Sequence, residues 1–187
     1  MGISRGLQCI KKIFVVLALL VTASGASGKV VYVDADAQGN HDGSSWTNAY
    51  SHLQDALADA RSSARPVEIR VAQGIYLPDR DSLVPGGNGS RTATFELISQ
   101  VAVKGGYAGF GAPDPNDRDV EMHETVLSGD LSQNDQPLED PKDLLDDASR
   151  AENVYHVVTG SFTNKTAVLD CFTIRGGNAN GTSYPKD

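Results

Sequence analysis

The sequence predicts an all-β fold of the solenoid type, in which short strands and glycine turns repeat and stack on one another. The 187 residues include 19 glycines and only 6% aromatic residues, a composition that favours turn-rich β structure over a helical bundle. Many short apolar stretches of alternating pattern stop at Gly, Asn or Asp. In addition, "VAVKGGYAG" (101–109) echoes "FTIRGGNANG" (172–181), which places Lys104 and Arg175 at matching points. Such repeats of a strand and a turn are what a solenoid requires.

Residues 1–26 have the pattern of a secretory signal peptide. Basic residues precede an apolar run from Ile13 to Ala23, and small residues follow that run. A run of about eleven residues is too short to span a bilayer core of about 30 Å. We therefore expect cleavage after Ala26, with an uncleaved membrane anchor as the alternative, and a single domain over 27–187.

The charge and the cysteine content limit the cellular locations and the classes of partner that we expect. Loss of the three positive charges in the signal would lower the formal charge from −8 to −11. Because nucleic acid and anionic membranes repel such a protein, we expect no nucleic acid partner, and no membrane span after signal cleavage. Cys9 leaves with the signal, so Cys171 stands alone and is expected to be a small buried side chain. The predicted location is secreted, extracellular or at the cell surface.

The first elements after the signal are a strand and a helix. The β-branched run "KVVYVDAD" at 29–36 predicts the strand. Ser51 and Gln54 have the spacing of a capping box at the start of a helix over 51–60. We expect Trp46 to cover the first coil, together with two leucines of the helix. The apolar stripe that predicts the helix consists of Leu53, Ala56, Leu57 and Ala60.

The rest of the chain reads as short strands separated by polar loops. Loops of this length in a compact domain usually carry function or extend from a repetitive scaffold. The predicted strand regions are 67–77, 93–107, 124–131, 153–160 and 167–178, and the polar excursions are 78–91, 112–123 and the acidic 132–152.

These stretches, taken in this order, resemble exported right-handed parallel β-helix proteins of the pectin-lyase-like superfamily. The resemblance extends over most of residues 29–181 and rests on "VYVDADAQGNHDGSSWTNAYSHLQDAL", "EIRVAQGIYLPD", "VAVKGGYAGFG", "ETVLSGDL", "NVYHVVTG" and "AVLDCFTIRGGNA". It implies a right-handed parallel β-helix (solenoid) with an N-terminal strand-plus-helix cap, and the chain reads as truncated at its C-terminal end. Cys171 departs from the pattern, since relatives would more usually have Gly before "FTI", and this departure predicts an altered corner.

Two acidic stretches are candidate metal sites. Counted from Asp34, an EF-hand loop places Gly39 correctly at position 6 but puts Ser45 where a bidentate Glu is needed. We therefore interpret 34–45 as a turn and expect no metal and no cofactor. The second stretch, 130–147, is interpreted as a solvated acidic loop, and weak calcium binding there stays open. Its potential oxygen ligands are Asp130, Asn134, Asp135, Glu139, Asp140, Asp143, Asp146 and Asp147.

Candidate groups for acid–base chemistry are few, so the catalytic residues stay unknown. Strand alternation places His156 on the side of Val154 and Val158, which predicts a packed side chain. No paired carboxylate or Arg/Lys base is predicted on these strands. The strand-borne candidates are Glu68, Lys104, Glu124, His156, Asp170 and Arg175.

Two functions remain open at this point. The first is a non-catalytic extracellular β-helix scaffold or carbohydrate-contacting surface protein, whose partner is an extracellular polysaccharide or a cell-surface component. The alternative is a polysaccharide lyase or glycoside hydrolase whose catalytic groove lies in coils beyond Asp187. We favour the first function, because the strands offer no predicted acid–base pair.

Overall fold

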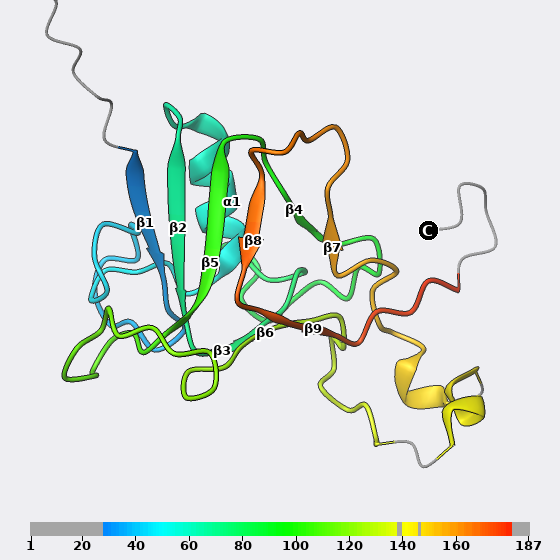
Figure 1. The fold of residues 1–187 in the computed structure, drawn as a ribbon. Helices are drawn as coiled ribbons and strands as arrows, with labels where there is room; N and C mark the ends of the chain where they lie inside the picture. The colour runs from blue at the N-terminus through cyan, green and yellow to red at the C-terminus, as the bar shows by residue number, and fades with distance from the viewer. Residues whose placement is uncertain (1–27, 138–139, 146, 181–187) are drawn as a thin grey trace, which may run out of the picture.

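The part of the chain that the structure describes consists mainly of parallel β-sheets with one α-helix, which confirms the all-β prediction in its coarse form (Figure 1). The computed structural model describes residues 28–137, 140–145 and 147–180, so the predicted signal peptide and Cys9 lie outside the described residues. The elements in chain order are β1 (Lys29–Val33), α1 (Leu53–Ser62), β2 (Val67–Ala72), β3 (Gly74–Tyr76), β4 (Phe95–Glu96), β5 (Val101–Tyr107), β6 (Thr125–Ser128), the 3-10 helices η1 (Pro141–Leu145) and η2 (Ala148–Arg150), β7 (Val158–Thr159), β8 (Val168–Asp170) and β9 (Thr173–Arg175).

The strands form three sheets, and all neighbouring strands within them run parallel. Sheet A has the order β1-β2-β5-β8, sheet B has β3-β6-β9 and sheet C has β4-β7. From β2 onward the chain visits the sheets in a fixed rotation, A then B then C, and begins again at β5 and at β8. Figure 1 shows the four strands of sheet A standing side by side in front of α1. Strands that are distant in the sequence therefore become neighbours.

The core is built from rows of apolar side chains that repeat from strand to strand. Val31, Ile69, Val103 and Leu169 occupy one register position across sheet A. The first three are buried, and Leu169 packs against the same cluster. Complete burial of each such side chain stabilises the fold by about 1.5–3 kcal/mol. This row packs the strands of the sheet against one core, in addition to the backbone ladders between them.

The helix α1 lies where the apolar stripe predicts it, but the predicted capping box is absent. The four stripe residues are all buried. The N-cap residue is His52, which makes no side-chain cap hydrogen bond. Instead, Gln54 Nε2 donates to the backbone oxygens of Pro78 (2.6 Å) and Thr94 (3.0 Å), while the Ser51 hydroxyl lies 3.1 Å from His41 Nδ1. Tertiary partners have replaced the local cap.

Residues 43–50 cover the outer edge of β1. Backbone hydrogen bonds join Tyr32 N to Gly43 O, Tyr50 N to Tyr32 O, and Asp34 N to Tyr50 O. These bonds satisfy groups that an edge strand would otherwise present to solvent. The expectation that Trp46 covers the first coil beside α1 is wrong, because its ring packs with Tyr32 and Tyr107 in a cluster separate from the main core.

Several predicted strands are shorter than expected because the chain turns corners within them. The predicted strand over 167–178 is divided into β8 and β9, and Cys171 lies between them. Cys171 is only half-buried and has a φ of 63°, the left-handed region that favours glycine. The prediction of a buried Cys171 is therefore wrong. The altered corner stays a prediction, because Cys171 adopts the backbone conformation that glycine would take there. Lys104 and Arg175 are not equivalent either, since they lie in sheets A and B.

None of the helices in the described part of the chain has both the length and the apolar character needed to cross a membrane.

Candidate functional site

Three of the strand-borne candidates come together on the outer face of sheet A. Lys104 lies in register with Asp170, and its Nζ donates to Glu68 Oε2 at 2.6 Å. Arg70 Nε donates to the other oxygen of Glu68 at 2.7 Å, and Arg118 donates to Asp170 at 2.8 Å. The sequence predicts no acid–base pair on these strands, and it did not indicate these ion pairs either, because strand register, which the sequence does not reveal, decides which outward side chains meet.

The electrostatics of this cluster suit structural ion pairs better than acid–base catalysis. Burial alone would raise the pKa of Glu68, but hydrogen bonds from Lys104 and Arg70 outweigh it and hold the pKa below its ordinary value. The hydrogen bond from Arg118, assisted by one from Cys171, lowers the pKa of Asp170. A general acid needs a raised pKa, so neither carboxyl group can serve as one at neutral pH.

The remaining candidates are dispersed. His156 is exposed, which contradicts its predicted packing: Val154 and Val157 are buried instead, because the backbone before β7 does not alternate as a strand. Glu124 accepts a hydrogen bond from the Thr173 hydroxyl at 2.8 Å. Arg175 lies exposed on β9 and lines a hollow together with His156.

Asp34 holds two segments together through backbone hydrogen bonds. It is buried, and its carboxylate accepts the N–H of Asp36 at 2.9 Å and of Phe110 at 2.6 Å. Burial foremost raises the pKa of Asp34, although these two hydrogen bonds act in the opposite direction. Residues 35–36 form the predicted turn. The carboxylate thus closes that turn against the loop around Phe110.

The acidic excursion is more tightly organised than a solvated loop. Arg150 Nη1 donates to Asp135 at 2.8 Å, and Asn153 Nδ2 donates to both oxygens of the same carboxylate. Asp130 accepts the N–H groups of Asn134 and Asp135. Burial raises the pKa of Asp135. Among the residues that the structure describes, no three His, Cys, Asp or Glu side chains are grouped so as to hold a metal ion.

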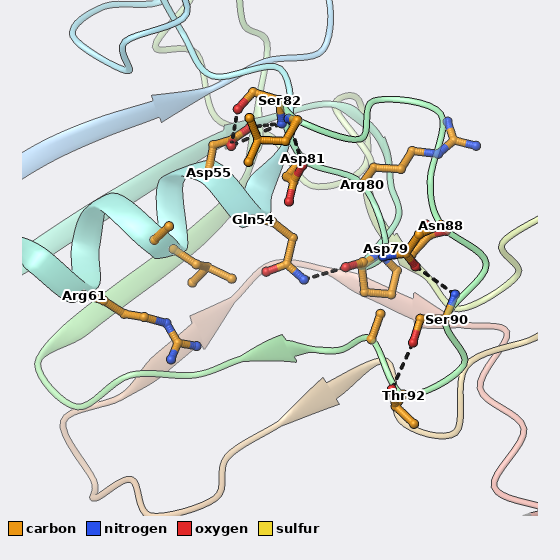
Figure 2. A pocket seen from close by; sticks show the side chains of 15 residues that line it. Gln54, Asp55, Arg61, Asp79, Arg80, Asp81, Ser82, Asn88, Ser90 and Thr92 are labelled. Atoms are coloured by element: carbon orange, nitrogen blue, oxygen red, sulfur yellow. Dashed lines mark hydrogen bonds between the residues drawn. The ribbon is translucent and has the colours of Figure 1, made fainter.

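A hollow with a polar lining lies between α1 and the loop that joins β3 to β4. It measures about 590 Å³. Figure 2 shows Gln54, Asp55 and Arg61 extending from α1, with Asp79 and Ser90 on the loop around them. We call this hollow the α1 cleft. Its lining residues are Gln54, Asp55, Leu57, Ala58, Arg61, Pro78, Asp79, Arg80, Asp81, Ser82, Leu83, Asn88, Ser90, Thr92 and Ala93.

Hydrogen bonds between α1 and the loop fix the shape of the cleft. The N–H of Ser82 donates a bifurcated hydrogen bond to the two oxygens of Asp55, and the Ser82 hydroxyl donates to one of them. Asp81 accepts from the N–H groups of Leu83 and Val84, which forms a local turn. Together with the Gln54 bond to Pro78, these contacts hold the loop against the helix. Such preorganisation lowers the entropy cost of binding a ligand.

Asp79 and Arg80 each bring a buried polar atom to the cleft that has no hydrogen-bond partner among the described residues, Oδ1 of Asp79 and Nε of Arg80. Asp79 is only 8% exposed, and its Oδ2 accepts the N–H of Gly89 at 3.0 Å. Gly87, at φ 82°, passes so close that a Cβ there would collide with the carboxylate. A buried carboxylate oxygen without a donor is costly, and such groups often mark functional sites.

Reasoning from the sequence identified the polar excursion 78–91 but not the cleft. The length of the excursion was the available signal, because long loops on regular scaffolds often bind ligands. The pairing of Asp55 with Ser82 joins residues 27 positions apart, and no periodicity indicates it.

Comparison with known proteins adds no relative. No family model matches the chain, and no match was found among the curated proteins or the solved structures.

Proposed function

We propose that this chain is the scaffold of an exported right-handed parallel β-helix of the pectin-lyase-like type, and that it contacts carbohydrate through the α1 cleft. The rotation of the chain through three parallel sheets, with rows of side chains in register, supports the β-helix proposal. Right-handedness follows the strong general preference of parallel crossover connections. The strand β1, the segment 43–50 and α1 then form the N-terminal cap.

The polar lining of the α1 cleft carries the functional proposal. Carboxylate, amide, hydroxyl and guanidinium groups face one hollow of about 590 Å³. Sugar rings present hydroxyl groups that both donate and accept hydrogen bonds, so a lining of this chemistry suits them. The hollow is also large enough for one or two sugar rings, on the scale of pockets that hold small ligands.

Binding without catalysis is the version of this function that the contacts favour. Asp55 and Asp81 are already occupied by N–H and O–H donors of the loop, and Arg61 donates to Glu96 at 2.7 Å. A catalytic pair would need one carboxyl group free to give a proton and a second group free to accept it. The ion pairs on sheet A are likewise engaged with one another.

The expected surroundings agree with this function. The signal-like segment 1–26 favours export of the protein. The formal charge of −8 disfavours nucleic acid as a partner and leaves extracellular polysaccharide or a cell-surface component as the proposed partner.

The proposal is tested by filling the cleft from its helical wall. Ala58 is exposed on α1 and lines the cleft, so Ala58→Tyr places a ring in the hollow. Ser62→Tyr adds the same ring at an exposed position of α1 outside the lining and serves as the matched control. We expect the protein to bind at least one class in a panel of neutral, acidic and amino oligosaccharides, and Ala58→Tyr alone to lose that binding. A panel without any binder, or binding that survives Ala58→Tyr, would contradict the proposal.

A further inference from the structure

The α1 cleft carries an excess of negative charge. Three carboxylates line it, those of Asp55, Asp79 and Asp81, against the two guanidinium groups of Arg61 and Arg80. Arg61 is paired with Glu96, which lies outside the lining. The positive charge that Arg61 offers to a ligand is therefore partly neutralised. Because low-dielectric walls concentrate the field of like charges, a hollow of this kind attracts cations.

Asp79 is a carboxylate of the cleft that has no positively charged partner among the described residues, and one backbone N–H, from Gly89, is its hydrogen-bonding partner. A charge that the protein itself does not neutralise interacts strongly with a positive group brought beside it, since little water screens the pair. Charge-assisted hydrogen bonds are also roughly twice as strong as neutral ones.

A bare metal ion is not the cation that these observations favour. Ca²⁺ and Mg²⁺ take six or more oxygen ligands, and Zn²⁺ takes about four Cys, His or carboxylate ligands, in each case arranged around a point. The described residues contain no grouping of three acidic, histidine or cysteine side chains suited to a metal. In contrast, an ammonium group needs only one or two carboxylates, and the rest of the ligand that carries it can form hydrogen bonds with the polar side chains nearby.

We propose that the saccharide taken by the α1 cleft carries a free amino group, charged at neutral pH, that lies against Asp79. This inference rests on the proposed function and specifies its ligand. The ammonium group donates to the carboxylate side of the cleft, and the ring hydroxyls exchange hydrogen bonds with Asn88, Ser90 and Thr92 on the rim. The preference thus runs toward amino sugars and away from uronic acids, whose carboxylates the cleft repels.

The test compares two oligomers that differ in a single group. A β-1,4-linked tetramer of glucosamine carries an amine where the tetramer of N-acetylglucosamine carries a neutral amide. By calorimetry on the full protein we expect the glucosamine tetramer to bind at least about tenfold more tightly. The variant Asp79→Asn retains the shape of the side chain and should abolish that preference, whereas Asp119→Asn, a loop aspartate outside the cleft, should preserve it.

A pH series on the unmodified protein provides a second measurement that needs no variant. Amines next to electron-withdrawing groups lose their proton at about pH 8. We therefore expect the preference for the glucosamine tetramer to disappear by about pH 9.5. Equal affinity for the two tetramers at neutral pH would overturn this inference while leaving saccharide binding intact. Binding of only neutral or acidic sugars would do the same. Absence of binding to every oligosaccharide would overturn both proposals.

Discussion

Glu68 shows how one residue sets the electrostatics of a whole sheet face. Its two oxygens accept from Lys104 on the next strand and from Arg70 two residues along its own strand. The Arg70 guanidinium in turn lies 5.9 Å from the ring centre of Tyr32 and 5.7 Å from that of Tyr107. Removal of the Glu68 charge would leave two cations close together and half-buried.

This arrangement predicts a pH-dependent loss of stability. Because the folded state lowers the pKa of Glu68, its contribution is present above the ordinary value of 4.5 and is lost as the pH falls through the lowered value. We expect Glu68→Gln to lower the free energy of unfolding by about 1–2 kcal/mol at pH 7, with little difference left at pH 2.5. Urea unfolding at both pH values measures this. The exposed Glu121→Gln is the control, and an equal cost at both pH values would contradict the assignment.

Cys171 offers a second test at the scale of one residue. Its φ of 63° suits glycine, tolerates cysteine, and disfavours a β-branched side chain. We expect Cys171→Gly to retain or raise the unfolding temperature, and Cys171→Val to cost about 1–3 kcal/mol. Thermal unfolding of the two variants side by side is sufficient. If valine is tolerated as well as glycine, the corner is not left-handed.

At the scale of elements, α1 is fastened to the rest of the protein by its first turn. Gln54 reaches the backbone oxygens of Pro78 and Thr94, which lie at the two ends of the loop that closes the α1 cleft. The helix therefore packs on the core with one face and positions a binding loop with another.

Loss of this amide should loosen the loop more than the helix. We expect Gln54→Ala to lower stability by about 1–2 kcal/mol and to speed proteolytic cleavage between residues 82 and 90 several-fold, because two backbone oxygens lose their donor. Limited proteolysis with mass spectrometry locates the cut. Gln38→Ala, at an exposed position on another loop, should leave the cleavage rate unchanged.

The same elements explain what the sequence could and could not predict. The apolar stripe of α1 could be predicted because helical periodicity is a local property of the sequence. Its capping was not, since the partners of Gln54 lie 24 and 40 residues away. His156 was misplaced because β7 pairs over only Val158–Thr159, so the assumed alternation does not hold before it. The ion pairs of sheet A depend on register, which becomes known only when the strands are stacked.

At the scale of the whole molecule, the two ends of sheet A differ. The outer edge of β1 is hydrogen-bonded to residues 43 and 50. At the opposite end, Val168 on β8 is 40% exposed, and Ile174 on β9, the next strand in the chain and the last in sheet B, is 50% exposed. Within the described residues β8 pairs only with β5. Burial and hydrogen bonding therefore decline from β2 and β5 toward β8.

This gradient predicts the order of amide exchange. We expect the slowest exchange in β2 and β5, intermediate exchange in β1, and the fastest strand exchange in β8 and β9, because local opening costs least where fewest contacts are lost. Hydrogen–deuterium exchange with peptide-level mass spectrometry resolves these strands. Equal protection of β1 and β8 would mean that the covering segment 43–50 does not protect its edge.

The row of stacked side chains in sheet A has a consequence for how such a chain can diversify. Each strand meets its neighbours at fixed register positions, while the loop between β3 and β4 leaves the stack and returns to it. The middle of that loop, between Ser82, which bonds to Asp55, and Arg91, which bonds to Asn153, can vary in length and sequence without displacing a strand. Recognition and folding are then encoded in separate parts of the sequence. A library confined to residues 83–88 would sample new ligands while the contacts of Ser82 and Arg91 with the framework are kept.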